Sequence, residues 1–79
     1  MAYSLVNESV GELFLDDINK VQVAVCKDSS GVVQALDIRK YFIPKGGSDW
    51  LPTKQGIRIS RDEINEFSSL LSEAVARFN

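Results

Sequence analysis

The hydrophobic pattern of this chain changes its period once, at Ser60, and that change dictates the order of the secondary structure. Before Ser60, apolar and polar residues alternate in short runs, which is typical of strands with one buried face. After Ser60, apolar residues recur at steps of three or four, which is typical of an amphipathic helix. The pattern therefore predicts strands first and a single C-terminal helix after them.

Four runs before Ser60 are predicted as strands, and they cover residues 11–17, 20–27, 32–42 and 56–60. Turn residues separate them, in particular Asp28-Ser29-Ser30-Gly31 and the proline- and glycine-rich loop from Ile43 to Thr53. Short links join antiparallel neighbours. We therefore expect an α+β fold, in which a four-stranded curved antiparallel sheet is followed by one helix.

The start of the helix has a recognisable signature. Ser60-Arg61-Asp62-Glu63 matches a capping box, in which the serine hydroxyl accepts from the Glu63 amide and the Glu63 carboxylate accepts from the Ser60 amide. We expect the helix to cover one face of the sheet and to leave the other face to water or a partner. The face expected to stay uncovered is polar and basic, with Gln22, Asp37, Arg39, Tyr41 and Arg58.

The chain length limits the fold to a single domain over residues 1–79, and residues 1–10 are a candidate flexible N-terminal segment. A domain of this size buries only ~60% of the surface of its unfolded chain and often gains stability by association. The helix stripe has more apolar positions than one small sheet can cover, so we predict a homodimer. The candidates for its interface are Phe67, Leu71, Val75 and Phe78.

The residues present argue against an enzyme. The chain contains no histidine, which excludes serine–histidine and cysteine–histidine nucleophiles and histidine-ligated metals. Asp16 and Asp17 are adjacent on a predicted strand, so they point to opposite faces and cannot act as an acid–base pair. Gly46-Gly47 lacks the pattern of a phosphate-binding loop. We expect no catalytic activity, no cofactor and no metal.

Cysteine usage and hydropathy bear on the compartment. Cys26 is the only cysteine, so an intramolecular disulfide is impossible and a reducing compartment is expected. Residues 1–10 do not resemble a signal peptide, and no apolar stretch approaches the ~20 residues that span a bilayer. These features predict an intracellular protein without a membrane partner.

The charge pattern favours a polyanionic ligand more than the net charge of −2 suggests. Residues 1–19 carry four acids and no base, and residues 62–79 carry four acids and Arg77 alone. Residues 20–61 hold eight cations against three acids, a local charge of +5. Such a segment attracts polyanions, although scattered lysines on a solvated face give the same count.

Two runs carry a resemblance to a known family. DIRKYF, from Asp37 to Phe42, and PTKQGIRIS, from Pro52 to Ser60, resemble segments of the positive-cofactor-four family of transcriptional coactivators and its phage and bacterial relatives. The resemblance extends from Asp28 to Phe67. It implies a homodimer whose C-terminal helices pack together and whose curved sheets bind single-stranded DNA in basic grooves, in the service of transcription, replication or recombination.

Carried over by position, the resemblance implies binding roles for Lys27, Arg39, Phe42 and Lys54, with Phe42 standing where the family usually has tryptophan. The chain departs from the family at Ser29 and Ser30, where relatives have an aromatic residue and a lysine, and at Gln55, where they have a second basic residue. A basic N-terminal tail is also missing, which favours a compact phage or bacterial member. Trp50, Phe14 and Lys45 are candidates to compensate.

The resulting nucleic-acid-binding set combines cations for phosphates with aromatic platforms for bases. Its members are Lys27, Arg39, Phe42, Lys45, Trp50, Lys54 and Arg58. Strict alternation places Phe42 with Leu36 and Ile38, in the core, unless a bulge rotates it outward. Tyr41 shares the face of Arg39 and is a further platform.

We therefore expect a sequence-tolerant binder of single-stranded DNA, with RNA as a further ligand, in the cytoplasm or nucleoid of a bacterium or phage-infected host, or in a nucleus. The alternative is a protein-interaction module that docks on a polymerase or another transcription or replication factor through its acidic ends. The two differ in salt dependence, because phosphate contacts weaken steeply as salt rises and an apolar docking surface does not.

Overall fold

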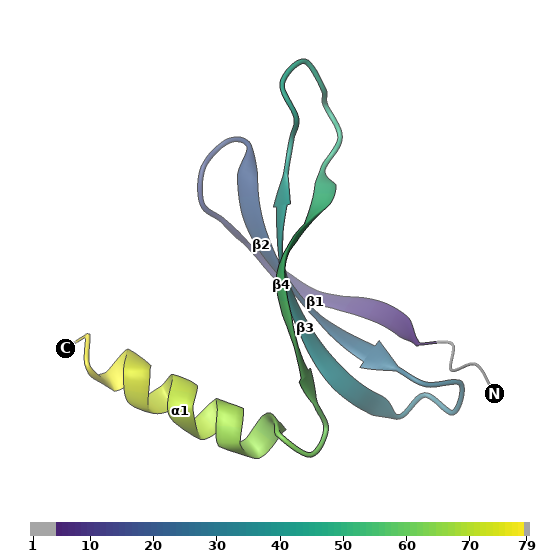
Figure 1. Ribbon diagram of the computed structural model, residues 1–79, viewed down its shortest axis with the longest axis vertical. Coiled ribbons are helices and arrows are strands. Elements are labelled where there is room, and N and C mark those ends of the chain that lie inside the picture. Colours follow the sequence, from purple (N-terminus) through teal and green to yellow (C-terminus); the bar gives the residue numbers. More distant parts are fainter. Residues whose placement is uncertain (1–4, 79) are drawn as a thin grey trace.

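The computed structural model describes residues 5–78, which form one antiparallel sheet and one helix (Figure 1). The elements are β1 (Val6–Phe14), β2 (Asn19–Lys27), β3 (Val33–Phe42), β4 (Leu51–Ser60) and α1 (Ile64–Ala76). Each strand pairs with its neighbour in sequence, so the sheet is a meander in the order β1-β2-β3-β4. This confirms the predicted four-stranded antiparallel sheet followed by a C-terminal helix.

Strand β1 lies earlier in the sequence than predicted. It takes in Val6 to Val10, which were expected as part of a flexible N-terminal segment, and it ends at Phe14 rather than at Asp17. The turn begins at Leu15 because its amide donates to the Asn19 carbonyl at 2.9 Å, and the Asp16 carboxylate accepts from the Ile18 amide at 2.9 Å. Asp16 and Asp17 are therefore turn residues.

Strand β4 begins at Leu51, five residues before the predicted start. Pro52 is compatible with this because β4 is an edge strand, where one row of amides has no ladder partner. Between Pro52 and Gly56 the ladder with β3 is irregular. There the Thr53 hydroxyl donates to the Lys40 carbonyl at 2.7 Å and accepts from the Gln55 amide at 3.1 Å.

The register divides the sheet into two faces, as the alternation predicted. Gln22 lies opposite Arg39, and Asp37 lies opposite Arg58. We call the side that carries these residues the polar face; it includes Glu12, Phe14, Lys20, Gln22, Ala24, Cys26, Ala35, Asp37, Arg39, Tyr41 and Arg58. The other side, the apolar face, carries Val21, Val23, Val25, Leu36, Ile38, Ile57 and Ile59.

The prediction that the helix covers one face of the sheet is wrong for the single chain. None of the residues Ile64–Ala76 is buried, and Figure 1 shows α1 projecting from the end of β4. The link before the helix is held against β3, because the Arg61 amide donates to the Gln34 carbonyl at 2.8 Å and the Arg61 guanidinium donates to the Val33 carbonyl at 2.7 Å. The helix therefore starts beyond the sheet, and the apolar face stays open.

The predicted capping box forms only in part. The Glu63 carboxylate accepts from the Ser60 amide at 3.4 Å, as expected, and it also accepts from the Ser60 hydroxyl at 2.8 Å. Because that hydroxyl donates to the carboxylate, the Glu63 amide donates to the Ser60 carbonyl instead, at 3.0 Å. This turn still leads into the helix.

The buried apolar side chains of the described residues are small. They are Ala24, Cys26 and Ala35, all on the polar face. On a sheet with strands about 4.8 Å apart, longer side chains on the neighbouring strands cover such short side chains and shield them from solvent. The large apolar residues are not enclosed. Over residues 5–78, no helix combines the length and hydrophobicity that a bilayer crossing requires.

Candidate functional site

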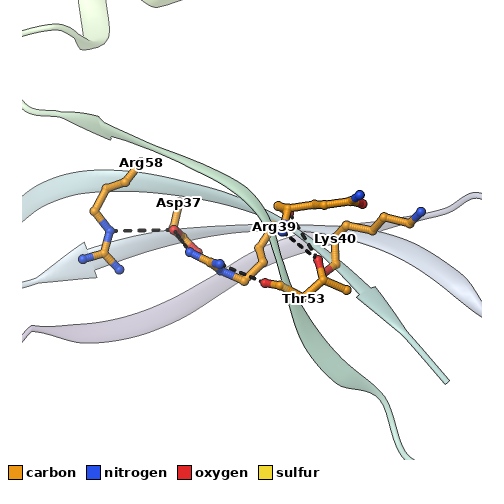
Figure 2. A network of polar contacts seen from close by, with 6 residues as sticks. Asp37, Arg39, Lys40, Thr53 and Arg58 are labelled. Atoms are coloured by element: carbon orange, nitrogen blue, oxygen red, sulfur yellow. Dashed lines mark hydrogen bonds and ion pairs between the residues drawn. The ribbon is translucent and has the colours of Figure 1, made fainter. Parts of the chain in front are cut away.

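The centre of the polar face carries two arginines on one carboxylate (Figure 2). Arg39 donates to Asp37 from Nη2 at 3.2 Å and from Nε at 3.4 Å. Arg58 approaches the same carboxylate from β4, with Nε 3.7 Å from Oδ1. Asp37 is 4% exposed, and its hydrogen bond and charge raise the pKa of Arg39 above its ordinary value. The cluster has two positive charges and one negative charge.

The backbone of β4 fixes where the Arg39 guanidinium lies. Arg39 Nη1 donates to the Thr53 carbonyl at 3.0 Å, within the irregular part of the strand. Gly56 lies directly opposite Arg39, and a Cβ atom at position 56 would be 3.1 Å from the guanidinium carbon. The glycine therefore leaves the room that the arginine side chain occupies.

One end of the polar face carries an aromatic cluster around Lys20. Phe14 and Tyr41 are the cross-strand neighbours of Lys20, and Trp50 comes from the loop before β4. The Lys20 Nζ atom lies 4.6 Å from the ring centroid of Trp50, 5.7 Å from that of Tyr41 and 5.8 Å from that of Phe14. It also forms an ion pair with Glu12 at 3.0 Å. Cation–π contacts of this geometry are stabilising.

The structure brings together three of the seven candidate binding residues. Arg39 and Arg58 share the Asp37 carboxylate, and Trp50 joins the same face through its contact with Phe14, whose ring centroid is 6.0 Å away. Phe14, which the sequence suggested as a compensating residue, is in this cluster.

The other four candidates lie elsewhere. Lys27 and Phe42 are on the side of the sheet opposite to Arg39. Lys27 forms an ion pair with Glu8 at 2.9 Å, and Phe42 is half-buried in line with Ile38. Lys45 and Lys54 are exposed near the β3–β4 loop, and within residues 5–78 neither has an ion-pair partner. The sequence-derived set is therefore spread over both faces.

The local charge of +5 over residues 20–61 does not form one positive surface. The acidic β1 pairs with the basic β2, and it brings Glu12 to Lys20 and Glu8 to Lys27. A charge count along the sequence cannot include these neighbours, because they depend on register. Besides the two arginines that share Asp37, four cations of this segment have no ion-pair partner among residues 5–78: Lys40, Lys45, Lys54 and Arg61.

Sequence reasoning missed Lys20 as the centre of the aromatic cluster. Lys20 is only 6% exposed. The sequence did not predict this burial, because lysine is usually found on the protein surface. The sequence held no signal for it, because Phe14 lies opposite Lys20 only in the register that the turn at residues 15–18 sets.

The candidate dimer residues are on the unburied helix or just beyond it. Phe67 is half-buried, and Leu71 and Val75 are exposed. Phe78 follows the last helical residue and is 89% exposed. Apolar side chains of this size, exposed along one stripe, favour an interface.

Comparison of the chain with protein-family models, with curated proteins and with solved structures found no match. The resemblance of the DIRKYF and PTKQGIRIS runs to the positive-cofactor-four family stays a prediction.

Proposed function

We propose that the chain binds single-stranded nucleic acid, without sequence readout, on the polar face of its sheet. One observation carries the proposal. The cluster of Asp37, Arg39 and Arg58 and the aromatic cluster around Lys20 lie on the same face of the sheet, in successive rows of the ladder. Lys20 and Tyr41 occupy one row, Gln22 and Arg39 the next, and Ala24, Asp37 and Arg58 the one after it. Rows on one face are about 6.7 Å apart.

Guanidinium groups beside aromatic rings match the phosphates and bases of single-stranded nucleic acid. Exposed guanidinium groups bind phosphate oxygens, and aromatic rings stack on bases of any sequence. Duplex DNA offers its bases only within grooves, which are read by an inserted helix or ribbon, whereas single strands present them directly to a sheet. The resemblance to single-stranded DNA-binding coactivators supports the same function, with a role in transcription, replication or recombination.

The test is a fluorescence-anisotropy titration with labelled single-stranded DNA, single-stranded RNA and duplex DNA at several salt concentrations. We expect binding to single strands that exceeds binding to duplex and weakens as salt rises. Arg58→Ala should weaken binding to all single-stranded sequences and lower the salt slope by about 0.7, the value for one phosphate contact on a single strand.

Lys27→Ala is the matched control because it removes one positive charge from the opposite side of the same sheet. It should leave affinity and salt slope unchanged. Equal losses in the two variants would mean that overall charge, and not the polar face, attracts the strand. A wild-type protein that binds no oligonucleotide, or prefers duplex, would overturn the proposal.

We further propose that the binding form is a homodimer. The chain has an accessible surface of 6266 Å², whereas a compact monomer of 8.8 kDa has about 4,800 Å². Its radius of gyration is 14.7 Å, against about 12 Å for a compact domain of this length. The excess, about 1,500 Å² per chain, corresponds to about 3,000 Å² in a pair, which is the size of a stable homodimer interface.

The surfaces that a second copy would cover are the apolar face and the helix stripe. They meet at a groove of about 440 Å³ whose lining includes Val25, Leu36, Ile59 and Ile64. The groove lies where α1 departs from the sheet, and the helix of a partner offers apolar side chains of the kind that fill it. The polar face is on the other side and stays accessible.

A further inference from the structure

The aromatic cluster at the end of the polar face has features that a purely structural cluster does not need. Phe14 is 60% exposed although it contacts Trp50, and the contact joins the β1 end of the sheet to the loop before β4. The two rings are tilted by 57° with centroids 6.0 Å apart, a separation within the preferred range for aromatic pairs. More than half of the Phe14 surface is thus left to solvent.

Lys20 holds this arrangement and does not itself offer a charge to a ligand. It is 6% exposed, and Glu12 neutralises its charge at 3.0 Å. Its ammonium group lies closest to Trp50, at 4.6 Å from the ring centroid. This contact holds Trp50, a loop residue, against the sheet and beside Phe14.

The ring geometry decides how a flat ligand can bind. A base inserted between two rings needs them parallel and about 7 Å apart, twice the 3.4 Å stacking distance of bases. Rings tilted by 57° at 6.0 Å leave no such gap. A base can instead stack on the exposed part of the Phe14 ring, beside Trp50.

We propose that Phe14 and Trp50 form a stacking site for one unpaired nucleobase, with Lys20 as the residue that positions Trp50. This inference rests on the proposed single-strand binding and adds to it the place where the base is held. It moves the stacking site from Phe42, on the opposite side, to a cluster next to the row of Arg39. A strand that stacks here and continues along β3 reaches both arginines.

The first test uses Phe14→Leu, which keeps an apolar side chain and removes the aromatic face. We expect the affinity for oligothymidylate to fall by about tenfold, the scale of one stacked base, with the salt slope unchanged because stacking releases few counterions. On an abasic oligonucleotide of the same length, wild type and Phe14→Leu should bind equally. Phe42→Leu, the same change on the opposite side, is the control and should not alter affinity.

The second test uses the single tryptophan of the chain as a reporter. Stacking on the cluster should quench or shift Trp50 emission when oligothymidylate is added, and the abasic strand should not. If Phe14→Leu binds like wild type and Trp50 emission is unchanged while Arg58→Ala still loses affinity, the stacking site is refuted and single-strand binding stands. If the wild-type protein binds no strand, both proposals fail.

Discussion

At the scale of single residues, Asp37 sets how much positive charge the polar face presents. Its carboxylate lies within 3.7 Å of both Arg39 and Arg58, so its charge cancels one of theirs. Such an acid on a surface that binds polyanions lowers affinity, but it also holds two long side chains in place.

Asp37→Asn tests this balance. Removal of the negative charge leaves both guanidinium groups free for phosphate, so we expect tighter binding of single-stranded DNA at low salt and a salt slope steeper by about 0.7. The melting temperature should fall, because the arginines lose a charged partner. Anisotropy titrations with parallel thermal melts measure both effects, and a folded variant with weaker binding would contradict the expectation.

Phe42→Ala tests whether this ring serves packing or binding. Phe42 is half-buried on the side of Leu36 and Ile38, so we expect a loss of about 1–3 kcal/mol in the free energy of unfolding, less than for a fully buried ring. Affinity for single strands should not change under conditions where the variant is folded. Denaturant unfolding gives the first value. Intact stability with reduced affinity would restore Phe42 to the binding site.

The two faces were predictable from the sequence because alternation alone sets them, and Asp37, Arg39 and Tyr41 lie together as expected. The partners of the cations were not predictable, because Lys20–Glu12 and Lys27–Glu8 depend on the register between β1 and β2. The placement of Phe42 opposite to Arg39 followed from strict alternation, whereas the family resemblance alone suggested a binding role.

At the scale of elements, the β2–β3 turn is organised by one carboxylate. Asp28 Oδ1 accepts from the amides of Ser30 at 2.9 Å and Val32 at 3.0 Å, and Oδ2 accepts from the Gln34 side chain at 2.9 Å. Gly31 in this turn has a φ of 80°, which glycine adopts without strain. The sequence predicted this turn because its residue types are specific for it.

The hydrogen bonds from Gln34 and then from Val32 lower the pKa of Asp28 below its ordinary value of 3.8. A carboxyl group with a lowered folded-state pKa stabilises the fold above its unfolded pKa and loses that effect as pH falls through the folded pKa. We expect Asp28→Ala to melt below wild type at pH 6, and the difference to shrink below about pH 4. Thermal melts over pH 2.5–6 measure it.

Asp28→Asn is the control for that series, since it keeps an acceptor oxygen but cannot ionise. Its melting temperature should lie between those of the other two proteins at pH 6 and approach wild type at low pH. A difference between wild type and Asp28→Ala that stays constant across the range would show that ionisation of Asp28 does not stabilise the turn.

The strand ends were harder to predict than the strands. The first half of β1 is exposed throughout, its two valines included, so no buried face marks it. It is a strand because its backbone pairs with β2. The first half of β4 contains Pro52, which argues against a strand unless the strand is known to be at an edge. The start of the helix after the Ser60–Glu63 box was predicted correctly. Its separation from the sheet was not, because periodicity identifies an apolar face without its partner.

At the scale of the whole molecule, the open apolar face and the open helix stripe predict self-association. We expect a mass near twice 8.8 kDa by light scattering at micromolar concentration, and a melting temperature that rises with protein concentration because association stabilises the folded state. Leu71→Asp, on the helix stripe, should lower both. Ser69→Asp, on the opposite side of the helix, is the control. A monomeric wild-type protein would contradict the homodimer.

The edges of the sheet determine what kind of assembly such a chain can form. Exposed edge strands invite the addition of further strands, which leads to fibres. Here one edge is interrupted by the bulge at Ser9–Gly11 and carries Glu8 and Glu12, and the other contains Pro52 and a distorted ladder. Both edges resist extension. Growth by strand addition is therefore disfavoured, and the homodimer proposed above would form through the apolar face as a closed, symmetric pair.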